Sequence, residues 1–404
     1  MPISQGIQKR VVVARQTAKG VLAPVGGGQI MRRESATFGL SKEAYTTESE
    51  MTNRRQILSS RHGVRSVAGA VQGIFSPGTY ADPLAALLMR DFTVIADITG
   101  ASVTIAGTGP YTLTRAAGSY LTDGYKIGYI VRLTAGAFVA GNMQKNLLIV
   151  GVTALVLTVI ALNEHTLTAE GPVAAATVSV PGKVTWVPET GHTNIYYTVE
   201  QFNPETPQSE RNVDVKFTQA AISLPGSGNA SINFTAMGLN QTTDPAAYFT
   251  APLPETITDA LTAASGALFI GGVMQSVVTD VSMTIDGTGT AADASVGRNI
   301  KADIFMGKLK VSGTFTAYHE STVLGNFFIN EVRTSIVMAM TSGTTPNAGG
   351  VSFILSNVDF SSADPDDAET GLKRTYNFTG IFNSLGGPAL ATGATTIAMQ
   401  DTAA

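Results

Sequence analysis

The chain consists of short runs in which apolar and polar residues alternate, and this pattern predicts a protein built mainly of β-strands. Runs rich in Val, Ile and Thr recur through most of the sequence and are separated by Gly, Asn and Asp turns. Short helices or helical turns are expected at three places, residues 80–92, 256–264 and 322–328. The first has Asp82-Pro83 as a start signal, followed by Leu84 and Leu87 at helical spacing. The expected fold class is therefore all-β dominated, with short helices.

Residues 93–182 differ in character from the sequence on either side. Their Val, Thr and Ile enrichment and regular turns predict a small all-β domain, either a barrel or a sandwich. The predicted strands cover residues 102–105, 111–115, 127–133, 147–152 and 155–162. A more charged strand pattern begins at Lys183, so we interpret residues 93–182 as an insertion into another domain.

One phrase of the sequence occurs twice. Its anchors are Arg211, Asn212 and Phe234 in the first copy and Arg298, Asn299 and Phe315 in the second, with a longer Gly/Ser/Asn turn in the first copy. A duplicated β-hairpin of this kind predicts two similar modules in tandem. The expected divisions are a basic N-terminal arm (1–35), a first module (36–92 and 183–245) split by the insertion (93–182), a second module (246–385) and a mobile C-terminal tail (386–404).

The composition favours a protein that is covered by copies of itself. Hydrophobic residues make up 44% of the 404 residues, but charged residues only 14%, well below the roughly 25% of ordinary soluble domains. Much of the polar surface must therefore consist of hydroxyl and amide groups, although an ordinary β-rich monomer is also compatible with these numbers. The chain has no cysteine, which excludes disulfides, thiolate metal sites and cysteine nucleophiles.

The charge is unevenly distributed. Residues 1–65 carry eleven Lys or Arg against four Glu, whereas the remaining residues carry 15 basic and 26 acidic side chains. A basic segment can contact nucleic acid or dock on the acidic body of a neighbouring copy, and the absence of a dense Lys/Arg tract favours the second interpretation. The candidate inter-subunit arm residues are Lys9, Arg10, Arg15, Arg32, Arg33, Arg54 and Arg55.

Membrane and export signals are not expected. The N-terminus has no apolar signal-peptide core, and the most apolar stretch, residues 147–162, is shorter than the ~18–20 residues that span a bilayer. Two buried strands account for it better. The sequence thus indicates assembly in the cytoplasm and no membrane partner.

The sequence contains no recognisable catalytic or cofactor motif. None of the four histidines has a partner at metal-ligand spacing, and neither a P-loop nor a nucleophile elbow is present. The densest acidic cluster contains Asp364, Asp366, Asp367 and Glu369, but Pro365 interrupts the rhythm of a calcium loop. A solvated loop is favoured there, with a cation site or an acidic ring at an interface or lumen as alternatives. We expect no enzyme activity, no cofactor and no metal.

Several motifs follow one another in a suggestive order. They are Arg33-Glu34-Ser35-Ala36, Arg54-Arg55-Gln56, Arg61-His62-Gly63-Val64-Arg65-Ser66-Val67-Ala68-Gly69, Ser76-Pro77-Gly78-Thr79-Tyr80, Leu121-Thr122-Asp123-Gly124-Tyr125-Lys126-Ile127-Gly128 and Val131-Arg132-Leu133. In this order, over roughly residues 33–385, they resemble the major tail tube proteins of long-tailed (siphovirus-type) bacteriophages.

This resemblance implies a β-sandwich with a flanking helix whose inner strands close, in an oligomer, into a barrel around a DNA channel. Rings would stack through extended arms, a tape-measure protein and DNA would occupy the lumen without sequence-specific binding, and an acidic wall would let DNA pass. Two modules per chain then predict trimeric rings with pseudo-sixfold symmetry, with a hexamer as the alternative. A capsid decoration or adhesin-like virion protein is the second candidate, and a virion-associated depolymerase the third.

Overall fold

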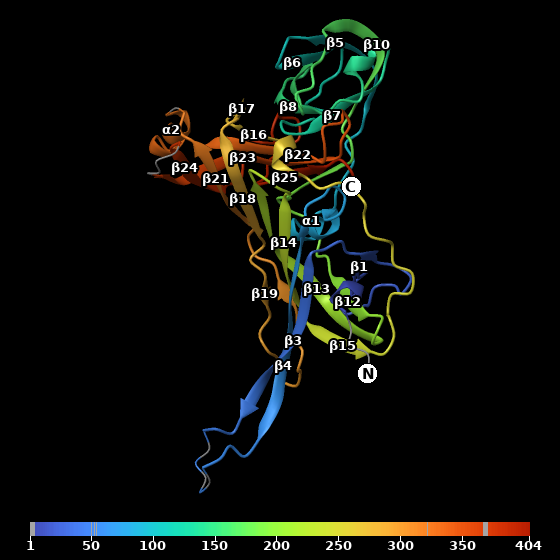
Figure 1. Ribbon diagram of the computed structural model, residues 1–404, viewed down its shortest axis with the longest axis vertical. Helices are drawn as coiled ribbons and strands as arrows, with labels where there is room; N and C mark the ends of the chain where they lie inside the picture. Colours follow the sequence, from blue (N-terminus) through green and yellow to red (C-terminus); the bar gives the residue numbers. More distant parts are fainter. Residues whose placement is uncertain (1–4, 50, 52, 54, 321, 367–370) are drawn as a thin grey trace.

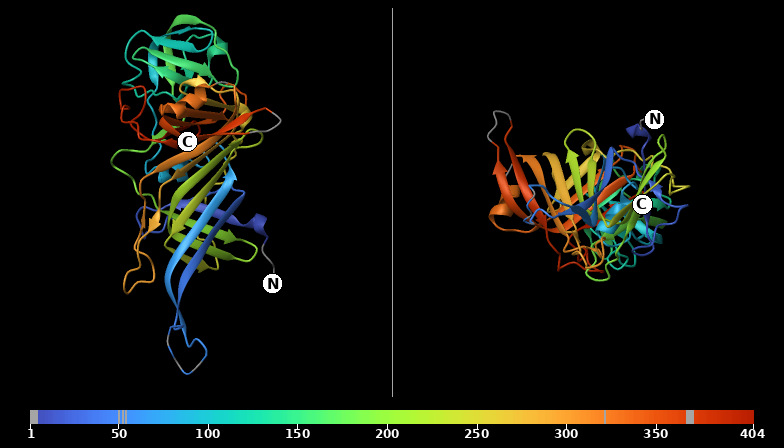
Figure 2. Two further views of the ribbon diagram at one scale, coloured as in Figure 1. Left: turned by 90° about the vertical axis from the view of Figure 1, so that its left-hand side faces the viewer. Right: turned by 90° about the horizontal axis from the view of Figure 1, so that it is seen from below.

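The computed structural model describes residues 5–49, 51, 53, 55–320, 322–366 and 371–404. The molecule is elongated, with a small barrel at one end, a body of long strands in the middle and a projecting hairpin at the other end (Figures 1 and 2). Strands predominate throughout, as the alternating pattern predicted, so the expectation of an all-β protein is confirmed.

Eight antiparallel strands form one continuous run across the body. In spatial order they are β3 (Ser35–Thr46), β4 (Ser60–Ile74), β14 (Ser231–Gly238), β13 (Gln208–Pro225), β18 (Val278–Asp286), β21 (Lys310–Tyr318), β24 (Lys373–Gly380) and β23 (Gly350–Pro365). Apolar residues at alternate positions, such as Val71, Phe234 and Phe315, are buried on one face of this run. The other face carries mostly small polar side chains.

Nine further strands complete a second layer behind this run. On β13 and its neighbours lie β1 (Arg10–Arg15), β2 (Gln29–Ile30), β12 (Tyr197–Asn203) and β15 (Asn240–Asp244); on β23 and its neighbours lie β16 (Gly266–Ile270), β17 (Val273–Met274), β22 (Thr334–Thr341), β25 (Ala398–Asp401) and β11 (Lys183–Trp186). Because β13 and β23 are long and each contains a β-bulge, they pass from one layer into the other. The core between the layers contains Tyr197, Phe217 and Phe353.

Two α-helices are present in the described residues, α1 (Ala81–Leu87) and α2 (Val323–Ile329), together with the 3-10 turns η1 (Gly6–Gln8), η2 (Ala140–Asn142) and η3 (Ala263–Ser265). The expected helices at residues 80–92 and 322–328 are confirmed. The expected helix at 256–264 is wrong, because these residues are almost entirely irregular and reach only the start of η3. Leu261 is nevertheless buried, so its apolar pattern reflects contact with the core rather than helical periodicity.

The segment between α1 and β11 forms a closed barrel of six strands. These are β5 (Ile98–Ala106), β6 (Tyr111–Arg115), β7 (Ile130–Ala135), β8 (Leu147–Val152), β9 (Val156–Ala161) and β10 (Glu170–Ser179), paired in the order β10-β5-β6-β9-β8-β7. The five strands predicted from sequence are confirmed, and β10 was missed. The barrel core continues into the body through Phe269, Val337 and Ile354, so the barrel is packed on the body rather than tethered to it.

The expected mobile C-terminal tail is wrong for its last part. Residues of β25 pair with β11 on one side and with β23 on the other, and Ile397 and Met399 are completely buried. Small and Thr-rich composition suggested mobility, but the alternation of Ile397 and Met399 is that of a central strand.

Candidate assembly surfaces

The eight-stranded run contains the same order of strand pairing twice. β3, β4, β14 and β13 follow one another in one half, and β18, β21, β24 and β23 follow in the same antiparallel order in the other. In each half a long excursion follows the first strand: residues 42–65 are the outer parts of β3 and β4 with the turn between them, and residues 287–309 lead from β18 to β21. A short helix follows the second strand in both halves. Both connections project toward the same end of the molecule (Figure 1).

Matching residues occupy matching places in the two halves. Gly69 on β4 pairs with Phe38, and Gly313 on β21 pairs with Met283 and Phe378. A Cβ atom would lie 2.2 Å from the Phe38 ring at Gly69 and 2.4 Å from the Phe378 ring at Gly313. An aromatic ring of a neighbouring strand therefore lies over each glycine, Phe38 from the first strand in one half and Phe378 from the third strand in the other. At Gly313 a Cβ atom would also lie 2.3 Å from the Ser282 carbonyl oxygen, so a larger residue fits at neither position.

These pairings give a residue-by-residue correspondence between the halves. Val67-Ala68-Gly69-Ala70-Val71 corresponds to Val311-Ser312-Gly313-Thr314-Phe315, and Ser41 on β3 corresponds to Asp286 on β18. Val215-Lys216-Phe217 on β13 corresponds to Val358-Asp359-Phe360 on β23. In both strands the register shifts directly after the phenylalanine.

The phrase singled out in the sequence does not mark two copies of one hairpin, so that interpretation of its anchors is wrong. Arg211 and Asn212 lie in β13 and Phe234 in β14, whereas Arg298 and Asn299 lie outside any strand, in the connection between β18 and β21. By strand pairing, Phe234 corresponds to Tyr376, and the counterpart of Phe315 is Val71. The similarity of the two short anchor segments is coincidental. The repeat that strand pairing identifies is a different one and is weaker in sequence.

The two halves join within the chain along β13 and β18. Seven residue pairs, from Gln219 with Asp286 to Pro225 with Asp280, form this ladder. Ala220 and Ile285 face each other there and are completely buried. The junction continues past the ladder, where the Gly287 N–H donates to the Thr218 carbonyl at 2.9 Å.

The outer ends of the run have open edges. Among the described residues, β3 pairs only with β4, and the segment of β23 from Asp359 to Pro365 pairs only with β24. Leu40 on β3 and Ala363 on β23, the counterparts of Ile285 and Ala220, are only partly buried. Unpaired strand edges of this kind favour pairing with another chain.

Part of the β3 edge is covered by side chains of its own chain. The buried Gln201 accepts the Phe38 N–H at 3.3 Å and donates to the Phe38 carbonyl at 2.9 Å. The Lys9 ammonium donates to the Ala36 carbonyl at 3.2 Å, and burial lowers its pKa. The edge is therefore open from Leu40 onward, toward the hairpin.

The solvent-facing side of the eight strands is lined by hydroxyl and amide groups. Several of these side chains bond across neighbouring strands: Ser282 with Thr314 at 2.8 Å, Thr316 with Thr375 at 3.1 Å and Asn377 with Ser362 at 2.6 Å. On this face of β13, β18, β21, β24 and β23 the charged side chains include Asp280, Asp286, Asp359, Asp364, Lys310 and Lys373. The face is thus chiefly neutral, with a small excess of carboxylates.

The basic residues expected in an inter-subunit arm mostly bond their own chain. Arg15 forms ion pairs with Asp82 at 2.5 Å and Asp91 at 2.6 Å, close to α1. The remaining contacts are from Arg10 to the Phe249 carbonyl, from Arg32 to the Thr258 carbonyl and from Arg33 to the Lys9 carbonyl. In this chain β1 is a strand of the second layer.

The exposed extension is instead the β3–β4 hairpin, whose tip lies beyond the body (Figure 2). Tyr45, Ile57 and Leu58 are about half exposed on it. Arg55 is also exposed near the tip, and Arg54 lies outside the described residues. Toward its tip the hairpin presents basic and apolar groups to solvent, whereas at its base Arg65 bonds Asn240 and Asn299 of its own chain.

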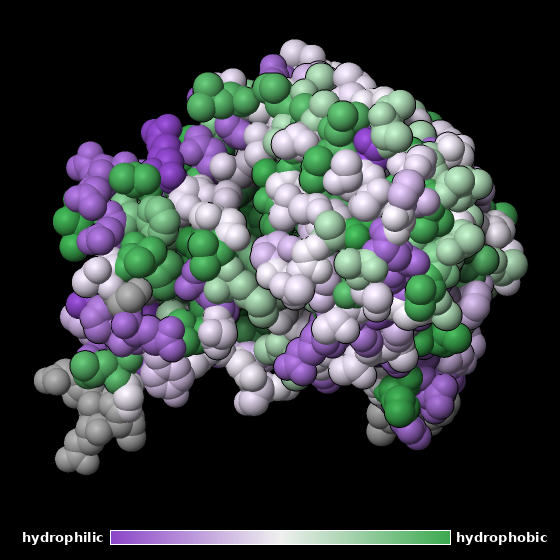
Figure 3. Space-filling view, turned by 90° about the horizontal axis from the view of Figure 1, so that it is seen from above, coloured by the Kyte–Doolittle hydropathy of each residue, from purple (hydrophilic) through white to green (hydrophobic). Residues whose placement is uncertain are grey.

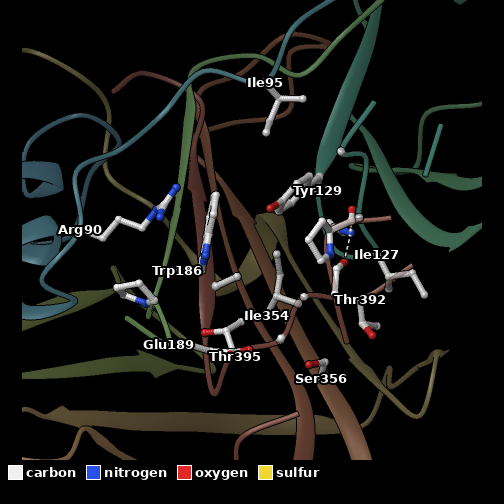
Figure 4. A pocket seen from close by; sticks show the side chains of 18 of the residues that line it. Arg90, Ile95, Ile127, Tyr129, Trp186, Glu189, Ile354, Ser356, Thr392 and Thr395 are labelled. Carbon is white, nitrogen blue, oxygen red and sulfur yellow. Dashed lines mark hydrogen bonds between the residues drawn. The ribbon is translucent and has the colours of Figure 1, made fainter. Parts of the chain in front are cut away.

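A cavity of about 520 Å³ lies where the barrel meets the body (Figure 4). The Arg90 guanidinium lies 3.6 Å from the Trp186 ring centroid on one wall, and Tyr129 and Ile354 line the other. Burial raises the pKa of Tyr129, which favours the neutral phenol. The lining is predominantly apolar, which is typical of a packing interface between two parts of a fold.

Metal-binding clusters are absent from the part of the chain that the structure describes, where no three His, Asp or Glu side chains are grouped to hold an ion. Asp364 is exposed at the end of β23 and Asp366 in the loop beyond, while Asp367 and Glu369 lie outside the described residues. Neither described helix is long and apolar enough to cross a membrane.

A family model described as phage tail tube protein matches residues 6–380, almost the whole chain. The chain belongs to the phage tail tube protein family. A search of curated proteins finds no match. Membership assigns this tail tube protein a structural, non-enzymatic role in the virion tail, where subunits of the family self-assemble into a tube. The resemblance noted from the order of sequence motifs is confirmed.

Proposed function

We propose that this tail tube protein forms trimeric rings that stack into the DNA-conducting channel of a non-contractile phage tail. The supporting observation is the ladder between β13 and β18, in which the last strand of the first half pairs with the first strand of the second half within one chain. The open edges of β23 and β3 are the counterparts of those two strands. A second copy can therefore repeat the same junction between chains, and three chains with two halves each would give pseudo-sixfold symmetry.

The internal junction supplies a register for the proposed seam. Ser362 corresponds to Gln219 and Ser41 to Asp286, so Ser362 of one copy would pair with Ser41 of the next. In the same register Ala363 would pair with Leu40, which completes the burial of both. Pro365 would lie opposite Phe38, where no further backbone bond is needed because Gln201 already bonds Phe38.

Closing the run would place its hydroxyl-lined face around the lumen. A basic wall would hold DNA through counterion release, whereas neutral and weakly acidic groups give no such attraction. Side chains such as Ser282 and Thr314 already bond each other, so they offer few free donors to phosphates. We propose that DNA and a tape-measure protein pass this wall without sequence-specific binding, in rings assembled in the host cytoplasm.

The two modules proposed are residues 36–92 with 183–245 and residues 246–385, with 93–182 inserted between the parts of the first. The repeated pairing order supports this division, since each set of four strands falls within one proposed module. The barrel would then decorate the outside of the tube, because it lies on the second layer, away from the hydroxyl-lined face.

Engineered cysteines test this proposal directly, since the chain has none of its own. The pair Ser41→Cys and Ser362→Cys should give disulfide-linked trimers under mild oxidation, because directly opposed residues in antiparallel strands have Cβ atoms about 4.5–5.5 Å apart. The matched pair Ser41→Cys and Ser223→Cys should not, since Ser223 lies within the run.

The stoichiometry is measured on isolated rings by native mass spectrometry, and stacking by negative-stain microscopy. Rings of three chains that stack into tubes are the expected result. Rings of six chains would refute the trimer, and globules that never form rings would refute the proposed function.

A further inference from the structure

α1 and α2 end in the same backbone geometry. The Leu88 N–H donates to the Leu84 carbonyl and the Asn330 N–H to the Asn326 carbonyl, at 3.0 Å in each helix. The next residues, Met89 and Glu331, both have left-handed backbones, with φ of 54° and 53°. Counting back from this shared end, Ile329 of α2 corresponds to Leu87 of α1, and Phe328 corresponds to Ala86.

The two helices differ in what covers them. Leu87 is 1% exposed, whereas Ile329 is 69% exposed, and Phe328 and Val332 beside it are 38% and 48% exposed. Viewed from above, the side of the body that carries α2 shows hydrophobic residues among hydrophilic ones (Figure 3). An exposed cluster of large apolar side chains on one short helix indicates a contact surface.

Leu87 is covered by the connection that follows β18. A Cβ atom at Gly287 would lie 3.2 Å from Leu87 Cδ1 and 2.4 Å from the Met306 methyl carbon. This connection also bonds β13, since the Lys216 ammonium donates to the Ile304 carbonyl at 2.7 Å. The second half of the chain thus covers the helix of the first half.

We propose that the exposed apolar patch at the end of α2, formed by Phe328 and Ile329 of the helix and Val332 just beyond it, is the docking site for the base of the β3–β4 hairpin of a second copy. Residues 42–65, the outer part of the β3–β4 hairpin with its turn, correspond to residues 287–309 and differ from them in number by one. Lys42 corresponds to Gly287, the residue beside Leu87. The inference rests on the ring proposed above and assigns that ring a second contact.

The charges on the two surfaces are complementary. Lys42 lies directly opposite Arg65 in the hairpin, and two like charges in such a pair repel each other unless a counter-charge is near. Asp359 on β23 is exposed and occupies the place that Lys216 has in the first half. The Arg65 guanidinium donates to Asn240 Oδ1 of its own chain at 3.2 Å, whereas Lys42 is exposed. A docked hairpin would therefore bring the Lys42 ammonium toward Asp359. Tyr45 and Leu58, both about half exposed, supply apolar surface for α2.

The first test is a crosslink between copies. Lys42→Cys combined with Ile329→Cys should give covalent oligomers with a short bismaleimide, and either cysteine alone should not. The position of Gly287 beside Leu87 within the chain sets the expected proximity.

The second test is assembly of charge variants. Ile329→Asp should raise the protein concentration needed for ring formation about tenfold or more, because it places a charge in a contact that buries a large apolar side chain. Val139→Asp on the barrel, a site 53% exposed, is the matched control and should leave assembly unchanged. Asp359→Lys should weaken assembly, and Lys42→Glu should restore it in the double variant. Thermal unfolding of each monomer checks that the variants fold.

The outcomes separate the two proposals. Rings that carry the Ser41–Ser362 disulfide but show no Lys42–Ile329 crosslink, and assemble normally with Ile329→Asp, would overturn the docking site and leave the ring intact. Crosslinks between stacked rings rather than within one ring would also overturn it. Failure to form any ring would overturn the proposed function itself.

Discussion

Phe217 and Phe360 occupy the same point in two different strands. Each faces the core and directly precedes a β-bulge. Each also packs against an aromatic residue of the adjoining strand: the ring centroids of Phe217 and Phe234 are 5.5 Å apart, and those of Phe360 and Tyr376 are 6.1 Å apart. A bulge bends its strand, so these two residues mark where β13 and β23 turn from one layer into the other.

Truncation at either site should destabilise the protein. Phe217→Ala and Phe360→Ala each remove a buried ring, and we expect a loss of about 3–5 kcal/mol in the free energy of unfolding. Phe360→Ala should additionally speed amide hydrogen exchange in α2, because the ring centroids of Phe360 and Phe327 of α2 are 6.1 Å apart. Chemical denaturation and hydrogen exchange measure the two effects. Phe360→Leu should retain most of the stability, and an equally large loss there would contradict a packing role.

Glu200 should be the most sensitive carboxylate in the body. It is completely buried, accepts hydrogen bonds from the Ser209 hydroxyl at 2.6 Å and the Phe249 N–H at 3.1 Å, and lies 3.9 Å from the Arg10 guanidinium. Glu200→Ala leaves these donors without an acceptor, so we expect a loss of about 3–5 kcal/mol and faster proteolysis near Phe249. Glu189→Ala, at an exposed site, is the control and should change stability by less than ~0.5 kcal/mol.

Asp401 should make the stability of the C-terminal strand depend on pH. Burial raises its pKa from 3.8 to about 6, although the Gly78 and Ala403 N–H groups donate to its carboxylate. A raised pKa in the folded state means that this group favours folding below pH 3.8 and loses that contribution as pH rises through 6. Relative to Asp401→Asn, the wild-type protein should therefore gain about 2 kcal/mol in the free energy of unfolding when the pH is lowered from 7 to 4. Denaturation of both proteins at several pH values measures the difference, and a constant difference would contradict this burial effect.

The hydroxyl-lined face should bind DNA when basic side chains are introduced into it. Ser312→Lys and Ser223→Lys place ammonium groups on this face of β21 and β13, where both serines are exposed. Assembled tubes of the double variant should retain DNA at low salt and release it as salt rises, because such binding depends on counterion release. Thr168→Lys on the barrel is the control. Equal retention by the control and the double variant would place the DNA path elsewhere.

The sequence predicted the fold class and the barrel strands because their signals are local. Alternation of apolar residues and regular turns identify strands such as β6 and β9 without knowledge of their partners. β10 escaped notice because its register against β5 is repeatedly shifted, and bulges break the period of two on which the prediction depends. Strand existence was therefore easier to predict than strand order.

The assembly surfaces were harder to predict because they depend on pairing between distant residues. The basic residues Arg10 and Arg15 suggested an arm, but their acceptors come from segments tens to hundreds of residues away. The true repeat shares only patterns such as Val-x-Gly-x-Val and Val-x-Gly-x-Phe, which are too short to stand out. Pairing of Gly69 and Gly313 with their neighbours made the repeat visible.

The β13–β18 junction should form at any protein concentration. Because both strands belong to one chain, their effective concentration is fixed by the connecting segment, and this junction forms however few molecules are present. The β23–β3 seam joins separate molecules and depends on how many are available. Half of the joints around a three-chain ring would thus be made at folding, and only the other half would be subject to mass action.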